Sequence, residues 1–332
     1  MLFLIMALLS CQPQSAEDTP VVSAIGRVIK LDDQLDAIID SASFELLGTG
    51  YTWAEGPVWI ESEQALLFSD VPNNTIFKWT EGNKVKPFLT PSGSTDFVEK
   101  ASKEGANGLI LDAAGRLILC QHGDRRVARL NASFKEPTAE FESLATAFEG
   151  KLFNSPNDIA MNKAGQFFFT DPPYGLEKEA DRELNFQGVY RIDTTGAVVL
   201  LTDKLSRPNG IGLSPDESVL YVANSDPEKA IWMAYDLDSL GNIRHERVFY
   251  DATPEVLKAR GLPDGLKVDQ NGNVFATGPG GVWIFSPEGK HLGTISIYGV
   301  PVANCAFNAE QSELFLTAQN LLIKVSLKSN KS

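Results

Sequence analysis

Six polar side chains recur along the chain at intervals of roughly 50 residues, the spacing of a propeller-type repeat. Each is followed by a short side chain and then by an apolar stretch; these head residues are Glu55, Asn107, Asn157, Asn209, Asp264 and Asn304. Carboxylate and amide oxygens are the ligands that hard divalent cations prefer. Glu55 and Asp264 would supply two negative charges, and Asn157 and Asn209 two neutral oxygens. The set predicts a site for one divalent cation, most favourably Ca²⁺.

Two other interpretations of the head residues stay open at this point. Asn-Gly and Asp-Gly pairs also form tight turns, so any single head residue could be purely structural. A structural zinc site would need His or Cys ligands, and none of the three histidines, His122, His245 and His291, occupies a head position. Mg²⁺, Mn²⁺ and Zn²⁺ in a catalytic role remain alternatives to Ca²⁺.

The elements that must position these side chains are β-strands. From Phe44 onward each repeat has an apolar run, a turn rich in Asp, Asn, Ser and Gly, and a second apolar run, as at 117–120 and 167–170. Several antiparallel strands in each of six units predict an all-β, six-bladed propeller rather than a sandwich or a solenoid. Each head residue precedes the first strand of its unit, which lines the central channel of a propeller. The head residues should therefore meet at one mouth of that channel.

The N-terminus is typical of a targeting segment. Residues 1–10 are almost wholly apolar and too few to span a bilayer. Leu8-Leu9-Ser10-Cys11 matches a bacterial lipobox, in which cleavage would leave a lipidated Cys11 as the only membrane attachment. We expect residues 1–22 to be a lipoprotein-type signal and polar tether, and the protein to be exported as a periplasmic or outer-membrane-anchored lipoprotein. An ordinary cleaved signal and a cytosolic chain are the alternatives.

The remaining chain, residues 23–332, is expected to be one propeller domain with a short helical segment over 32–41, where Leu35, Ile38 and Ile39 have helical spacing. The formal net charge of −14 and the absence of a basic run argue against nucleic-acid binding. Cys120 and Cys305 lie in apolar stretches and are predicted to be core residues.

The chain resembles the gluconolactonase/regucalcin-like (SGL) family, and its middle segments look especially like microbial gluconolactonases. The resemblance runs from about Phe44 to the end and is carried by residues 54–59, 107–130, 155–176, 206–225 and 262–277. It implies a calcium-dependent six-bladed propeller lactonase. It also implies metal ligation by Glu55, Asn209 and Asp264, with Asn157 as a fourth ligand in several branches, and lactone contact by Asn107.

Two positions depart from related patterns. Regucalcin-type members carry an Arg where this chain has Gly105, and paraoxonase-like relatives carry a His where it has Asn107. The contacts with the substrate should therefore differ from those in the animal enzymes.

Two further residues are candidates for the substrate pocket. His122 follows a predicted strand, and Tyr174 lies in a stiff Asp-Pro-Pro-Tyr-Gly loop. We expect both to line the substrate pocket, although a structural His and a plain rigid turn are the simpler alternatives.

The expected reaction is hydrolysis of a sugar lactone, glucono-1,5-lactone or a related aldonolactone, to the aldonic acid. The cation would polarise the lactone carbonyl, and Asp264 or His122 would accept the proton of the attacking water. Asp158 could bind a second cation or cap a strand. A propeller that binds a sugar or a protein without turnover, and a lactonase or esterase for a non-sugar substrate, remain alternatives. A serine-hydrolase route is not supported, because the chain lacks the G-x-S-x-G motif.

Overall fold

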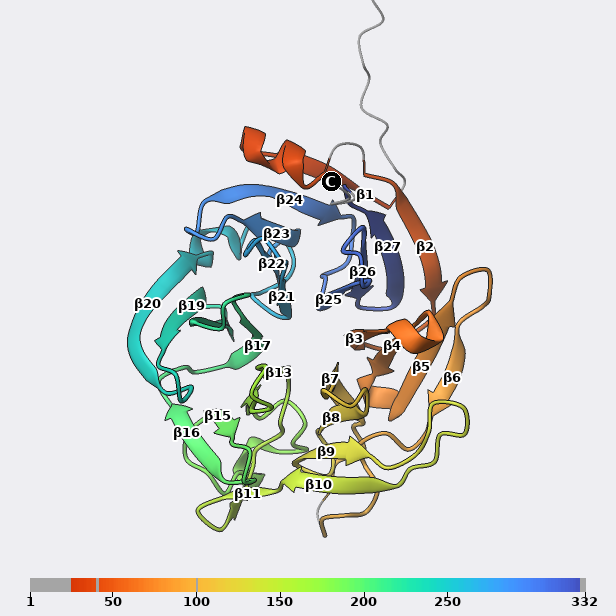
Figure 1. Ribbon diagram of the computed structural model, residues 1–332, viewed down its shortest axis with the longest axis vertical. Helices are drawn as coiled ribbons and strands as arrows, with labels where there is room; N and C mark the ends of the chain where they lie inside the picture. Colours follow the sequence, from red (N-terminus) through yellow and green to blue (C-terminus); the bar gives the residue numbers. More distant parts are fainter. Residues whose placement is uncertain (1–24, 40–41, 100, 329–332) are drawn as a thin grey trace, which may run out of the picture.

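The computed structural model describes residues 25–39, 42–99 and 101–328. Six antiparallel sheets radiate from a central axis as the blades of a propeller (Figure 1). The predicted all-β, six-bladed propeller is therefore confirmed. The predicted signal and Cys11 lie outside the described residues. Within the described ranges, no helix is both long and apolar enough to cross a membrane.

The strands of each blade run outward from the axis in chain order. Blade 1 contains β3 (Ala54–Ile60), β4 (Ala65–Asp70), β5 (Thr75–Thr80) and β6 (Lys86–Leu89). Blade 2 contains β7 (Ala106–Leu111), β8 (Leu117–Gln121), β9 (Arg126–Leu130) and β10 (Phe141–Ala145). Blade 3 contains β13 (Ile159–Met161), β14 (Phe167–Thr170), β15 (Val189–Ile192) and β16 (Val198–Thr202). Blade 4 contains β17 (Pro208–Leu213), β18 (Val219–Asp226), β19 (Lys229–Leu237) and β20 (Ile243–Asp251).

The last two blades are completed by strands from the beginning of the chain. Blade 5 contains β21 (Leu266–Val268), β22 (Val274–Gly278), β23 (Gly281–Phe285) and β24 (His291–Ile297), with β1 (Gly26–Lys30) outermost. Blade 6 contains β25 (Asn304–Phe307), β26 (Glu313–Ala318) and β27 (Leu321–Ser326), with β2 (Phe44–Thr49) outermost. Pairing of β1 with β24 and of β2 with β27 covers two sheet edges and fastens the end of the ring to its beginning.

Short elements decorate the ring. The described part of the predicted helical segment holds one 3-10 helix, η1 (Asp33–Ala37), whose Leu35 packs into the core of blades 5 and 6. The other 3-10 helices of the described ranges are η2 (Glu61–Glu63), η3 (Val71–Asn73), η4 (Glu179–Asp181) and η5 (Thr253–Glu255). β11 (Ala147–Phe148) and β12 (Lys151–Leu152) form a small ribbon in the insertion between blades 2 and 3.

The core is divided into six apolar clusters, and each cluster lies between two adjacent blades. Between blades 6 and 1, for example, Trp59 stacks on Phe315 with ring centroids 5.5 Å apart. Cys120 and Cys305 are buried free thiols in two of these clusters, as predicted. Because every blade contributes to two clusters, closure of the ring is required before all six are complete.

The inner strands approach one another so closely that a small residue must follow several head residues. A Cβ at Gly56 would overlap the backbone carbonyl of Asn107, and a Cβ at Gly210 would overlap that of Asp264. The same proximity lets the Gly108 N–H donate to the Asn157 carbonyl at 2.8 Å. The recurring glycine therefore allows neighbouring blades to meet at the axis, and it fixes the head residues of adjacent blades side by side.

Candidate metal and substrate site

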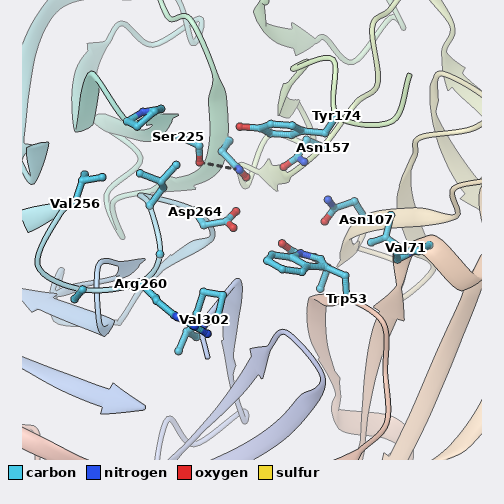
Figure 2. A pocket seen from close by; sticks show the side chains of 18 of the residues that line it. Trp53, Val71, Asn107, Asn157, Tyr174, Ser225, Val256, Arg260, Asp264 and Val302 are labelled. Carbon is cyan, nitrogen blue, oxygen red and sulfur yellow. Dashed lines mark hydrogen bonds between the residues drawn. The ribbon is translucent and has the colours of Figure 1, made fainter. Parts of the chain in front are cut away.

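The head residues gather at one mouth of the central channel, in a cavity of about 960 Å³. Figure 2 shows Asn107, Asn157 and Asp264 arranged around the same space, with Tyr174 and Trp53 beside them. The cavity is lined by every residue predicted for the site: Glu55, Asn107, His122, Asn157, Tyr174, Asn209 and Asp264. Residues more than 200 positions apart in sequence are thus brought together only by closure of the ring.

Two acidic side chains lie at the centre without a cationic partner. Glu55 is 3% exposed, and within the described ranges no Lys or Arg forms an ion pair with Glu55 or Asp264. Burial raises the pKa of Glu55 to about 7, against the opposing effect of the Gly56 N–H that donates to it. Burial also raises the pKa of Asp264 well above its ordinary value, and the neighbouring Glu55 and Asp158 carboxylates add to this effect. A bound cation would therefore stabilise the ionised forms of both carboxyl groups.

The amide side chains are oriented so that oxygens remain available. Asn209 donates from Nδ2 to Ser225 Oγ at 3.0 Å, and Ser225 in turn donates to the Pro263 carbonyl. This chain of hydrogen bonds fixes the amide orientation and leaves Asn209 Oδ1 for another partner. Asn107 Oδ1 is buried and has no hydrogen-bond partner in the described structure. Unsatisfied buried oxygens of this kind are expected where an ion or a ligand completes the site.

Asp158 lies beside the site but is engaged elsewhere. Its Oδ1 accepts from the Ile159 N–H at 2.9 Å, and its Oδ2 accepts from Asn304 Nδ2 at 3.4 Å. The ammonium of Lys267 is 3.9 Å from Oδ2. These contacts favour the strand-capping interpretation of Asp158 over a second cation site, because hydrogen-bond donors and a fixed positive charge already face the carboxylate.

His122 is held in the wall of the cavity by a residue that the sequence motifs do not indicate. Its ring is 2% exposed, and Nδ1 lies 3.0 Å from Glu104 Oε2. Nε2 is buried without a hydrogen-bond partner in the described part of the chain. Gly175 packs against the ring so closely that a Cβ there would overlap it. His122 is therefore an oriented imidazole with one nitrogen anchored and the other unpaired.

Tyr174 precedes Gly175 in the loop that packs on the His122 ring, and its hydroxyl end points toward Ser225 (Figure 2). Burial raises the pKa of the phenol to about 12, and the nearby Asp264 carboxylate contributes to the increase. The guanidinium of Arg207 is 5.8 Å from the ring centroid. Tyr174 thus remains a neutral hydroxyl next to the acidic centre, with part of its ring exposed for stacking on a ligand.

Several lining residues were not predicted. Trp53, Glu104 and Ser225 come from loops or strand ends, and residues 256–262 form a wall of the cavity that combines apolar side chains, such as the 98% exposed Leu257, with Lys258 and Arg260. The spacing of the head residues gives no signal for these positions. Proximity in sequence to Glu55, Asn107 and Asp264 could have suggested Trp53, Glu104 and residues 256–262, and Ser225 ends the 206–225 segment that carries part of the family resemblance.

The donor set fits one hard divalent cation. In the ranges that the structure describes, no group of three or more His, Cys, Asp or Glu side chains is arranged to hold a metal. The site instead combines two carboxylates with neutral amide oxygens, which is suited to Ca²⁺ or Mg²⁺ and not to a metal that requires nitrogen or sulfur ligands. The observation that supports this fit is the raised pKa of the buried Glu55 and of the half-buried Asp264, neither of which has a Lys or Arg partner in the described ranges.

The protein is a six-bladed propeller with an oxygen-lined site at its axis, and comparison with known proteins identifies its family. Residues 53–320 match the family described as the SMP-30/gluconolactonase/LRE-like region. The chain is 38% identical to a gluconolactonase of Zymomonas mobilis over 325 residues, 95% of this chain and 90% of that protein. The chain therefore belongs to the SMP-30/gluconolactonase/LRE-like family.

Solved structures show the same relationship. A gluconolactonase of Xanthomonas campestris superposes with a TM-score of 0.79 at 30% identity, covering 96% of this chain and all of that one. A calcium-binding regucalcin of Agrobacterium tumefaciens shares the fold, with a TM-score of 0.67 at 17% identity and coverage of 87% and 95%. By sequence, the chain is also 25% identical to a pentonolactonase of Haloferax volcanii over 276 residues, 82% of this chain and 83% of that protein.

Proposed function

We propose that the protein hydrolyses a sugar lactone to the open-chain aldonic acid and requires one divalent cation. The observation that supports this most strongly is the pair of carboxylates without a Lys or Arg partner, the buried Glu55 and the half-buried Asp264, beside the unpaired amide oxygen of Asn107 and the oriented amide of Asn209. Relatives named gluconolactonase and pentonolactonase support the reaction class. Glucono-1,5-lactone is the first substrate to test, and other aldonolactones follow.

The chain's own residues divide into three roles. Glu55, Asn157, Asn209 and Asp264 would hold the cation, most favourably Ca²⁺. When bound, such a cation polarises the lactone carbonyl and stabilises the negative charge that develops on its oxygen. Asn107 and Tyr174 would orient the sugar through hydrogen bonds and ring stacking. Ser225 keeps the Asn209 amide oriented for its role.

The proton of the attacking water needs an acceptor. Asp264 is one candidate, but a carboxylate that ligates a cation is a poor base. It also lies close to the carboxylates of Glu55 and Asp158, and this concentration of negative charge favours binding of the cation. His122 lines the same cavity without being one of the oxygen ligands. It is the stronger candidate, because its buried Nε2 has no hydrogen-bond partner in the described structure and could accept a proton from a water that enters with the lactone.

The test is an assay of lactone opening by the purified protein with and without a chelator. We expect turnover of glucono-1,5-lactone that disappears with the chelator and returns when Ca²⁺ is added back. Turnover that a chelator leaves unchanged would contradict the metal requirement. No turnover of any sugar lactone by the metal-loaded protein would favour the alternatives, a binding propeller or an enzyme for a non-sugar ester.

Export remains a separate proposal. The lipobox-like Cys11 would anchor the protein to a bacterial membrane through lipid and place the lactonase in the periplasm. Metabolic labelling with a fatty acid tests this proposal, because Cys11→Ala should abolish incorporation of label into the chain. Equal labelling of the two forms would contradict it.

A further inference from the structure

We infer that Glu104 is a positioning residue for His122, and that the pair delivers the general base of lactone hydrolysis. The inference rests on the proposed function. It adds a residue that lies outside the predicted ligand set and outside the motifs that carry the family resemblance. Its basis is the 3.0 Å contact between Glu104 Oε2 and His122 Nδ1, together with the unpaired Nε2 on the other side of the ring.

The contact determines which nitrogen carries the proton. An ionised carboxylate is an acceptor only, so the hydrogen bond requires Nδ1–H on His122. Nε2 is then the unprotonated nitrogen with a free lone pair. His122 is almost completely buried, and a buried ring nitrogen without a partner is costly unless a ligand or water completes it. A water bound beside the lactone would supply that partner.

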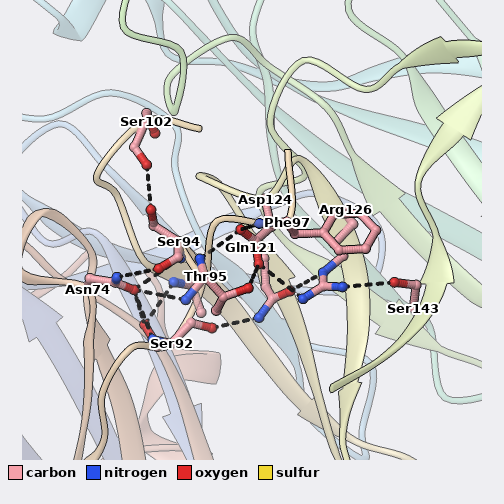
Figure 3. A network of polar contacts seen from close by, with 12 residues as sticks. Asn74, Ser92, Ser94, Thr95, Phe97, Ser102, Gln121, Asp124, Arg126 and Ser143 are labelled. Atoms are coloured by element: carbon pink, nitrogen blue, oxygen red, sulfur yellow. Dashed lines mark hydrogen bonds and ion pairs between the residues drawn. The ribbon is translucent and has the colours of Figure 1, made fainter. Parts of the chain in front are cut away.

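A partly buried polar network joins the segments that flank the two members of the pair (Figure 3). Gln121, next to His122, donates to the Ser92 carbonyl at 2.8 Å, and Asp124 accepts from the Thr95 N–H at 2.8 Å. Ser94 donates to the Ser102 carbonyl at 2.6 Å, two residues before Glu104. The loop that carries Glu104 is therefore tied to the strand end that carries His122.

Backbone hydrogen bonds join the two residues directly. The His122 N–H donates to the Gly105 carbonyl, and the Gly123 N–H donates to the Glu104 carbonyl, both at 3.1 Å. The carboxylate of Glu104 is partly exposed, and an ion pair on a mobile surface would contribute little. Here hydrogen bonds already fix the backbone of both residues, so only the Glu104 side chain loses conformational freedom when the contact forms.

The other charged groups near His122 are engaged elsewhere. Asp124 and Arg126 form an ion pair at 3.0 Å, and Arg125 donates from Nε to the Phe153 carbonyl at 2.6 Å. Tyr174, from the loop packed on the ring, is neutral over the working range because its pKa is raised. The cavity lining also holds Glu55 and Asp264, the predicted cation ligands. Lys258 and Arg260 line it too, but Lys258 pairs with Glu255 and Arg260 donates to the Gly299 carbonyl. Glu104 is the one of these groups whose side chain bonds the imidazole.

The proposed step balances as an addition of water. The water oxygen bonds to the lactone carbonyl carbon, and its proton passes to His122 Nε2. The ring C–O bond then breaks, and the imidazolium returns the proton to the leaving alkoxide oxygen, which becomes the hydroxyl of the aldonic acid. Glu104 neither gives up nor accepts a proton in this sequence. It holds the imidazole in one tautomer and stabilises the imidazolium that forms between the two transfers.

The experiment compares pH profiles of kcat/KM for the metal-loaded wild type, Glu104→Gln and Glu104→Asp. Glu104→Gln removes the charge that stabilises the imidazolium, so its acid limb should move to lower pH by about one unit while kcat falls roughly 10- to 100-fold. Glu104→Asp should keep the acid limb near that of the wild type. KM and metal affinity should stay within about twofold of wild type, because Glu104 touches neither the cation ligands nor the sugar in this account.

Two controls separate positioning from a structural effect. Glu136→Gln removes an exposed carboxylate of blade 2 that does not line the cavity, and it should leave the profile unchanged. In a His122→Gln background, Glu104→Gln should cause no further loss, because its effect acts through the imidazole. A Glu104→Gln protein with the wild-type acid limb and kcat, or a full second loss in the His122→Gln background, would overturn the inference.

The tautomer gives an independent test in the wild type, so the inference does not depend on how a variant folds. Long-range ¹H–¹⁵N correlation spectra should show His122 protonated on Nδ1. His291 is an internal reference, because its Nε2 faces the Gly293 carbonyl at 3.0 Å and should carry the proton. His122 protonated on Nε2 would contradict the inference. An inactive wild type would refute the proposed function instead, whereas an active wild type with an unaffected Glu104→Gln would refute only the role of Glu104.

Discussion

The change Glu55→Gln should stabilise the metal-free protein while it destroys the metal site. Glutamine keeps the shape of the side chain and an oxygen that accepts from the Gly56 N–H. It removes a negative charge that is buried beside Asp158 and that has no cationic partner in the described structure. A residue that serves only the fold would not be expected to stabilise the protein when it is replaced.

The magnitude follows from the pKa of Glu55, which burial raises from 4.5 to about 7. Between these values the folded, metal-free protein holds a proton that the unfolded chain has lost, so the free energy of unfolding falls as the pH rises. The penalty is absent below the lower value and complete above the upper one, where it amounts to about 3 kcal/mol. Glu55→Gln should therefore gain about 3 kcal/mol near pH 8 in chelator, and almost nothing near pH 4.5.

Denaturant unfolding followed by tryptophan fluorescence measures the difference at several pH values. With Ca²⁺ at about 100 times its Kd, the wild type should gain about 2.7 kcal/mol and the variant almost nothing. Glu136→Gln is the matched control, because its carboxylate is exposed and its replacement should change stability little at any pH. A Glu55→Gln protein that is less stable than wild type in chelator near pH 8, or one that still gains stability from Ca²⁺, would refute the reasoning.

Three further predictions concern the elements that position the site. Ser225→Ala frees the Asn209 amide to rotate and should weaken metal affinity roughly 10-fold, with titration calorimetry as the measurement and unchanged affinity as the contrary result. Gly56→Ala should cost at least about 2 kcal/mol more than Gly115→Ala in unfolding experiments, because both glycines have positive φ but only Gly56 meets a neighbouring blade; equal costs would contradict the close-approach argument. Deleting residues 1–49 removes β1 and β2 and should abolish cooperative thermal unfolding, and a truncated chain with the wild-type melting curve would refute closure of the ring by these strands.

Much of the fold could be predicted because repetition amplifies a weak local signal. A single strand-turn-strand pattern is ambiguous, but six copies with a polar head residue and a small neighbour identify blades and place the head residues at the axis. The prediction that Glu55, Asn209 and Asp264 share one cavity follows from that topology alone, and the structure places them there. Their roles as ligands remain predictions.

The rest depends on contacts that no local pattern encodes. The helical spacing over residues 32–41 gives only the short helix η1 in the described part, because Leu35 packs against strands of blades 5 and 6 and not against a helical partner. Ring closure by β1 and β2 pairs residues that are distant in sequence, such as Gly26 with Ile297 and Phe44 with Val325. Glu104 meets His122 only because an insertion folds back on blade 2, and insertions have no periodicity that could place them.

The most direct test of the account is a crystal structure of the protein grown with Mn²⁺, whose anomalous signal locates the ion without reference to the protein. The account predicts one strong peak at the axial mouth, in contact with carboxylate oxygens of Glu55 and Asp264 and with the amide oxygen of Asn209. A peak elsewhere on the chain, or these three side chains turned away from an ordered ion, would contradict it.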